Sequence, residues 1–502
     1  MDTLFKFVTV QSRFRMNGKV KKINYVDDFV QLQNVRKFRM SKEVKSIEKE
    51  FDNASVGRLV LKLGLPAMLA QFFNILYSIV DRIYIGHMPS GADMALASIG
   101  VCSPAFTAIT GFASLVGVGG AALMSISLGQ KNARAAQKAL NNSLMMLVIL
   151  SIIVTVILLL VKRPLLYLLG CSDAMYPYAS AYYTIYSFGT AAVLCGTGMN
   201  RFIMGQGYAR HGMMSVVIGA VLNIILDPVF IFVLDMGIAG AAWATIISQF
   251  GVLLYVFIVL GSKKMPIRLG FGGYDMSVCL RTLGIGSMSF LIIFLDNFLI
   301  ILLNAMLRKY GGALGDSYIS YAAVVQSVCV IAVCPAEGIT SGCATLFSYY
   351  YGAGNSKRIR KSFYYVLLVC GIYLGLITLA TQLVPEMFVR LFISDAQAVA
   401  QTAEFVKRYN LGLTIVAVQF AFVDGFTAMG MVKEAIPISF FRKGLYVVAV
   451  LVLPMLFPLE YIFYAGSIAD IFGSLFTIAM YFLVLNPRLE KLMKVEKEKI
   501  IT

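Results

Sequence analysis

The chain has 502 residues, of which 59% are hydrophobic and 14% are charged, and its mean hydropathy is +0.79. Soluble proteins carry about 25% charged residues, so this composition excludes an ordinary soluble enzyme. The net charge of +17 would suit a nucleic-acid partner if it formed a basic face. The basic residues are instead distributed between long apolar runs, which excludes that class.

Apolar runs recur along the chain from residue 58 to residue 485. A transmembrane helix needs about 20 mostly apolar residues, and the runs lack the two-residue alternation of a membrane β-strand. We therefore predict an all-α polytopic membrane protein with twelve transmembrane helices. The predicted spans are 58–86, 95–127, 139–161, 176–203, 213–234, 237–260, 282–305, 318–350, 362–384, 400–429, 437–457 and 460–485.

Two segments in the middle of the chain resemble each other at a constant offset of 223 residues: GGAALMSISLGQKN at 119–132 and GCATLFSYYYGAGN at 342–355. Two homologous halves of six spans each would enter the membrane from the same side, which predicts two six-helix lobes related by a pseudo-twofold axis along the membrane normal. The matched pairs are Gly119/Gly342, Ala121/Ala344, Leu123/Leu346, Ser125/Ser348, Gly129/Gly352, Asn132/Asn355, Tyr186/Tyr409 and Gly189/Gly412.

This repeat divides the chain into five predicted parts. The N-terminal extension is basic and has no apolar core for a signal peptide, and Met16 and Met40 are alternative start positions within it. The parts are the extension 1–52, an N-lobe 53–260, a cytoplasmic linker 261–281, a C-lobe 282–485 and a charged C-terminal tail 486–502.

The basic residues between the spans predict the orientation, because Lys and Arg are enriched in cytoplasmic loops. One set of loops holds sixteen and the opposite set seven, so both termini are predicted to face the cytoplasm, in the plasma membrane. The larger set is Lys131, Arg134, Lys138, Arg201, Arg210, Lys263, Lys264, Arg268, Arg281, Lys357, Arg358, Arg360, Lys361, Lys433, Arg442 and Lys443. The smaller set is Lys162, Arg163, Arg308, Lys309, Arg390, Lys407 and Arg408.

Two acids lie inside the apolar runs of the first half, where an ionisable residue costs about 2.5–3.5 kcal/mol and is usually kept for function. Asp81 lies roughly 22 Å beyond Pro66 in span one, and Asp227 roughly 21 Å along span five, so both are at similar depth. Tyr77 precedes Asp81 by one helical turn, and Asn223 precedes Asp227 by one turn. Thr245 lies roughly 12 Å into span six.

Two carboxylates with amide and hydroxyl oxygens make a hard-cation site, which predicts transient sodium binding at Asp81 and Asp227. Two adjacent carboxylates also repel each other when both are ionised, so the pair could hold a proton instead. The structural alternative is that Asp81 pairs with an arginine and Asp227 hydrogen-bonds a neighbouring helix. Arg82 adjoins Asp81 but faces another direction on a helix.

The second half has acids at other positions. Asp296 and Asp470 lie near mid-depth, where they either attract a cationic substrate or satisfy each other, whereas Glu337 and Asp424 lie nearer the predicted cytoplasmic ends. No catalytic chemistry is indicated. The glycine-rich turns lack the P-loop lysine, the only histidines, His87 and His211, have no second ligand nearby, and no nucleophile has a base. We predict a protein that is not an enzyme and has no cofactor.

Five segments in order, from about residue 52 to 485, resemble the multidrug and toxin extrusion (MATE) family, especially its bacterial branch. They are YSIVDRIYIG, VGVGGAALMSISLGQKNARAA, LNIILDPVFIFVLDMGIAGAAWATIISQ, LFSYYYGAGNSKRI and AMGMVKEAIPISFFRKGLY. The resemblance implies a twelve-helix antiporter that exports organic cations and other amphiphilic compounds in exchange for sodium or protons.

The resemblance also implies residue roles. An acidic site in the N-lobe would comprise Asp81, Asn223, Asp227 and Thr245, with Tyr77 and Tyr182 nearby. Pro66 resembles a proline that lets the first helix bend between states, and Asn200 is a further candidate for the polar network.

The expected function is therefore secondary active multidrug efflux by alternating access, with small molecules and the bilayer as partners, no nucleic acid, and a monomer sufficient. The alternative is a lipid-linked oligosaccharide flippase of the same superfamily, which usually carries basic residues in its cavity for pyrophosphate. A non-transporting sensor would leave Asp81 and Asp227 unexplained.

Overall fold

The computed structural model describes residues 42–88, 91–393, 395–487 and 490, with two short strands before them. The strands β1 (Arg15–Met16) and β2 (Lys19–Val20) pair antiparallel and belong to a unit of their own, Met1–Ser41. The helical unit begins at Lys42. The predicted start at Met40 and most of the predicted C-terminal tail lie outside the described residues.

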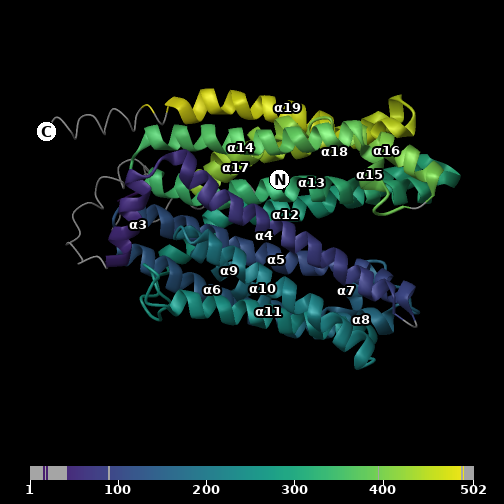
Figure 1. Ribbon diagram of the computed structural model, residues 1–502, viewed down its shortest axis with the longest axis horizontal. Coiled ribbons are helices and arrows are strands. Elements are labelled where there is room, and N and C mark those ends of the chain that lie inside the picture. The colour runs from purple at the N-terminus through teal and green to yellow at the C-terminus, as the bar shows by residue number, and fades with distance from the viewer. Residues whose placement is uncertain are drawn as a thin grey trace. The chain divides into compact units, whose positions relative to one another are not determined.

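The first half of the helical unit begins with α3 (Lys42–Asn53), and its helices lie together in the lower part of the view (Figure 1). They are α4 (Val56–Gly86), α5 (Ala92–Gly129), α6 (Ala133–Leu160), α7 (Lys162–Leu168), α8 (Tyr176–Phe188), α9 (Thr190–Gly205), α10 (Ala209–Pro228), the π-helical turn η3 (Val229–Val233) and α11 (Gly237–Gly261).

The second half follows after residue 275, and most of its helices, coloured green to yellow, lie in the upper part of Figure 1. They are α12 (Met276–Gly311), η4 (Gly312–Leu314), α13 (Gly315–Gly352), α14 (Ser356–Leu383), α15 (Pro385–Val389), α16 (Ala396–Asn410), α17 (Leu413–Ala428), α18 (Val432–Leu456), η5 (Leu459–Phe463), α19 (Tyr464–Met480) and η6 (Tyr481–Leu485).

Long apolar helices make this a multi-pass membrane protein. Within the described residues, ten helices are long and apolar enough to cross a bilayer, and the bent pair α16 and α17 would be an eleventh span. Large apolar side chains point outward from these helices; Leu160 is 77% exposed, Leu254 64% and Leu376 63%. Such outward faces are stable in lipid rather than in water. The remaining predicted span, 176–203, is divided between α8 and α9, each too short to cross alone.

Both halves break a span at a repeat-equivalent glycine. Gly189 separates α8 from α9, and Gly412 precedes α17, where α16 and α17 meet at 46°. A β-carbon at Gly189 would lie 2.6 Å from Ile246 Cγ1, and one at Gly412 would lie 2.9 Å from Asp470 Cβ. Each break therefore exists where the last helix of its half packs directly against the glycine backbone.

Hydrogen bonds repeat between the halves with the sequence offset. Ser125 Oγ donates to the carbonyl of Gly205 at 2.7 Å, and Ser348 Oγ donates to the carbonyl of Ala428 at 2.7 Å. The side chains of Asn132 and Asn355 each accept a backbone N–H at 3.0 Å and cap α6 and α14. The predicted repeat is therefore preserved in side-chain geometry.

The two halves meet backbone to backbone where α5 crosses α13. A β-carbon at Gly129 would overlap the carbonyl oxygen of Tyr349, and one at Gly352 would overlap that of Ile126. Gly129 and Gly352 differ by 223 residues, and so do Ile126 and Tyr349, so the two contacts are the same contact with the halves exchanged, as a twofold axis through the crossing requires. Small residues permit such close helix approach in membranes.

Several helices begin earlier than the predicted spans. Helix α14 begins at Ser356 and α12 at Met276, six residues before the predicted starts at 362 and 282. The side chain of Asp275 caps α12 by accepting from Ser277 N at 3.0 Å. The cap residue, rather than the first apolar residue, fixes where these helices start.

Helix α3 ends against α13 and α14 of the second half. The carbonyl of Phe51 accepts from Tyr350 Oη at 2.9 Å and from Arg358 Nη1 at 2.6 Å. The Phe51 ring meets the Tyr349 ring edge-on at 4.9 Å. A guanidinium at the C-terminal end of a helix satisfies carbonyls that lack an intrahelical partner.

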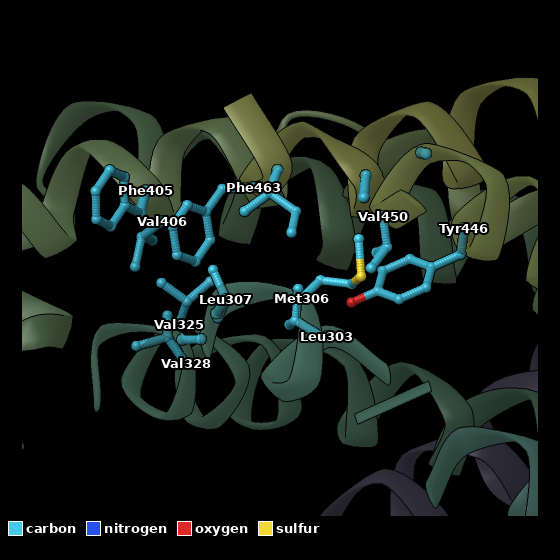
Figure 2. Close-up of a cluster of buried hydrophobic side chains, with 14 of the residues drawn as sticks. Leu303, Met306, Leu307, Val325, Val328, Phe405, Val406, Tyr446, Val450 and Phe463 are labelled. Atoms are coloured by element: carbon cyan, nitrogen blue, oxygen red, sulfur yellow. The ribbon is translucent and has the colours of Figure 1, made fainter. Parts of the chain in front are cut away.

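The core of the second half contains an apolar cluster from α12, α13, α16, α18 and η5 (Figure 2). Phe405 stacks on Phe463 with ring centroids 4.2 Å apart, and Met306 lies beside Tyr446. This packing holds α12 and α18, which carry charged residues described below, in a fixed relation.

Candidate functional site

The two predicted acids of the first half come together. Asp81 on α4 and Asp227 on α10 are within hydrogen-bonding reach of each other, and Asn223 Nδ2 donates to Asp227 Oδ1 at 3.1 Å. Asp227 is completely buried. Asp81 Oδ1 and Asp227 Oδ2 are buried without a donor among the described residues. Two carboxylates in contact need a proton or a cation between them.

The pair has no basic partner. Among the described residues, neither acid forms an ion pair, and Arg82, which follows Asp81 in the sequence, is exposed. The predicted alternative, in which an arginine neutralises Asp81, is therefore absent from this part of the chain. Asp227 directly precedes Pro228 and the π-helical turn η3, a local irregularity that is frequent at functional sites.

Tyrosines surround the acids. Tyr77 interacts electrostatically with Asp81 and Asp227, and Tyr182 and Tyr186 interact with Asp81. Tyr186 stacks on Phe106 with ring centroids 3.8 Å apart. Tyr77 and Tyr182 belong to the predicted site. Tyr186 was absent from it, although its position one turn after Tyr182 was the available signal.

The structure gives three other predicted residues the following positions. Thr245 Oγ1 donates to the carbonyl of Ala241 within its own helix at 3.0 Å, and Pro66 lies within the continuous helix α4. Asn200 Nδ2 donates to the carbonyl of Gly212 at 3.3 Å. Gly212 and Asp227 are on one helix, roughly 22 Å apart at 1.5 Å per residue, so Asn200 does not reach the acid pair.

A second site is a cavity of about 510 Å³ between the two halves. Its walls contain apolar and hydroxyl side chains from α5, α12, α13 and α17, and charged residues lie among them. The charged residues that line it are Arg201, Asp296, Glu337, Asp424, Arg442 and Lys443. This cavity is large enough for a drug-sized molecule.

Ion pairs within the second half neutralise part of this charge. Arg442 Nε donates to Asp470 Oδ1 at 2.8 Å, and Lys443 Nζ donates to Asp296 Oδ1. Asp296 lines the cavity, whereas Asp470 lies behind Arg442 and is 5% exposed. The two acids were predicted to attract a substrate or to satisfy each other; in the structure each has its own basic partner.

Arg442 and Lys443 were assigned to a cytoplasmic loop, and this was wrong. Both lie inside α18, where Lys443 is buried and Arg442 is half-buried. Arg201 was assigned to the same set, but it lies in α9 and lines the cavity. Without these three residues the charge comparison is thirteen against seven. The excess of basic residues therefore still lies on the side that is predicted to be cytoplasmic.

Comparison with known proteins identifies the family. The MatE family model matches residues 66–229 and 293–453, one segment in each half of the chain. The chain belongs to the MatE family of transporters. Both segments contain charged residues of the sites described above.

Two curated relatives of this MatE protein come from staphylococci. The chain is 23% identical over 438 residues to "Multidrug export protein MepA" of Staphylococcus aureus (strain N315), covering 86% of this chain and 95% of the relative. It is 22% identical over 437 residues to the MepA protein of Staphylococcus saprophyticus, with the same two coverages.

Solved MATE structures share the fold. An outward-facing multidrug resistance MATE transporter of the MOP superfamily superposes with a TM-score of 0.82 at 19% identity, covering 91% of this chain and all of the other. A MOP superfamily transporter from Pyrococcus furiosus, described as having a binding pocket of reversed polarity, gives the same values. The predicted fold, twelve spans in two six-helix lobes, is confirmed for this MatE protein.

Proposed function

We propose that this MatE protein is a secondary active multidrug efflux antiporter that exports organic cations or amphiphilic compounds in exchange for sodium or protons. Support comes first from the names of its relatives, which are multidrug export proteins. The observation that carries the proposal is the buried Asp81–Asp227 pair, because one oxygen of each carboxylate, Asp81 Oδ1 and Asp227 Oδ2, is buried without a donor among the described residues. A visiting cation or proton supplies what the pair lacks.

Coupling requires that ion binding at the acid pair change the substrate cavity. Asp81 and Asp227 are on different helices, α4 and α10, so a cation or proton between them draws these helices together. Helix α4 also carries Gln71, which lines the cavity. Ion binding therefore changes the cavity wall. By linkage, substrate and ion lower each other's affinity.

The flippase alternative predicts a cavity lined by basic residues. Three basic residues line the cavity of this protein. Two of them are neutralised by Asp296 and Asp470, and Glu337 and Asp424 add negative charge. The balance favours a positively charged substrate over a pyrophosphate.

The test is uptake of a fluorescent organic cation into inverted membrane vesicles with the sodium and proton gradients imposed separately. We expect one gradient to drive uptake by the wild-type protein. Asp227→Asn should reduce uptake to the level of vesicles without the protein, because an amide has no negative charge to bind sodium and does not take up and release a proton. Asp235→Asn is the matched control, since Asp235 is exposed just beyond η3 and should transport normally.

Full gradient-driven uptake by Asp227→Asn would refute the role of the acid pair. Uptake by the wild type that ignores both gradients would refute antiport itself. Equal loss in Asp235→Asn would show that the effect is not specific to the pair.

A further inference from the structure

Three charged side chains of the cavity have no ion-pair partner among the described residues: Arg201, Glu337 and Asp424. Arg201 comes from the first half, and the two acids come from α13 and α17 of the second. Thr340 Oγ1 donates to Asp424 Oδ2 at 2.5 Å. The guanidinium makes no hydrogen bond within the described residues.

Arg201 nevertheless lines the same cavity as these acids. The guanidinium is beyond ion-pair distance of both, and its attraction is to Asp424 first and to Glu337 second. A β-carbon at Gly117 would lie 3.3 Å from Arg201 Cγ, so the glycine leaves room for the arginine stem to pass α5. The side chain is thereby directed into the cavity, toward the opposite lobe.

The remaining charges do not balance. Once Lys443 and Arg442 are paired with Asp296 and Asp470, the cavity retains two carboxylates and one guanidinium. The acids therefore attract any cation that enters, and Arg201 repels it. Arg201 is part of the protein and cannot leave the cavity, but its side chain can adopt another rotamer.

We propose that Arg201 is a tethered counter-cation that competes with a cationic substrate for the negative charge of Glu337 and Asp424 across the cavity. The inference rests on the proposed function and concerns its cationic substrates. A cation that enters next to the two acids weakens their electrostatic attraction to Arg201, which belongs to the opposite lobe. A neutral compound leaves this attraction unchanged.

The experiment is equilibrium binding of tetraphenylphosphonium, a monocation without hydrogen-bonding or titratable groups, to the purified full-length protein in detergent. Arg201→Gln should lower its Kd by roughly tenfold, the size expected when one like charge several ångströms away is removed at partial burial. Arg201→Lys retains the charge and should bind as the wild type does. Glu337→Gln and Asp424→Asn should each raise the Kd.

A neutral probe separates charge from shape. Tetraphenylsilane has the same shape, no charge and no hydrogen-bonding group, and its binding in detergent should be the same in wild type and Arg201→Gln. An equal gain for the neutral probe would overturn the proposal, as would unchanged or weaker cation binding in Arg201→Gln. If that variant does not fold, Arg201→Met keeps the stem beside Gly117 and is measured in the same way.

The two proposals fail separately. If wild-type vesicles show no gradient-driven export, the antiport proposal fails, whatever Arg201 does to binding. If export is intact and Arg201→Gln binds tetraphenylphosphonium no more tightly than the wild type, only the tethered-cation proposal fails.

Discussion

Two acids of the second half, Asp296 and Asp470, are neutralised by neighbouring basic residues, Lys443 and Arg442. Asp470 is 5% exposed and accepts from Arg442 Nε at 2.8 Å. Removing one partner of a buried pair leaves the other charge without compensation, which costs about 3–5 kcal/mol. The acid pair of the first half has no such partner, which is why it can serve a mobile cation.

This contrast gives a stability prediction. Arg442→Gln should lower the midpoint of thermal unfolding of the detergent-purified protein by several degrees, because Asp470 remains buried and charged. Arg390→Gln is the control, since Arg390 pairs with Glu386 at an exposed position, where ion pairs contribute little. Equal midpoints for the two variants would contradict the assigned importance of the buried pair.

Individual residues show where prediction from sequence succeeds. Asp81 and Asp227 could be paired because both lie deep in apolar runs, and helical rise alone sets them at similar depth. Arg442 and Lys443 could not be placed in the same way. The predicted span 437–457 contains both, yet the charge comparison counted them as loop residues, because the partners that offset their cost, Asp296 and Asp470, are distant in sequence.

At the scale of elements, the crossing of α5 and α13 depends on Gly129 and Gly352, where the backbones touch. Gly129→Ala should destabilise the purified protein by about 1–3 kcal/mol, the usual cost of overpacking, because the methyl group would meet the carbonyl oxygen of Tyr349. Thermal unfolding with and without substrate measures this.

Gly371→Ala is the matched control, because a β-carbon there would meet nothing within 4 Å. In the middle of α14 this change should be neutral or slightly stabilising, since alanine favours helices. A Gly129→Ala protein as stable as Gly371→Ala would mean that the helices can separate without cost at this crossing.

Sequence patterns located the spans but not their interruptions. Composition reports how apolar a segment is, and therefore which segments cross the bilayer. It does not report the breaks at Gly189 and Gly412, which depend on α11 and α19 packing against them. The caps at Asn355 and Asp275 are visible in the sequence, whereas a rule that ends spans at charged residues starts α14 and α12 six residues too late.

For the whole molecule, two halves of common origin carry different chemistry. The first contains an acid pair without a basic partner, and the second contains ion pairs beside a cavity. The repeat predicted the shared helices and the twofold crossing. It could not predict this division, because Asp81 and Asp227 have no equivalent acids at the offset of 223.

The central claim is that organic-cation export and ion entry are one coupled process that passes through Asp227. The direct measurement is ion movement in proteoliposomes when a gradient of organic cation is imposed and no ion gradient is present. The account predicts opposite movement of sodium or protons with the wild type and none with Asp227→Asn. Substrate movement by the wild type without either ion, or ion movement that persists in Asp227→Asn, would contradict it.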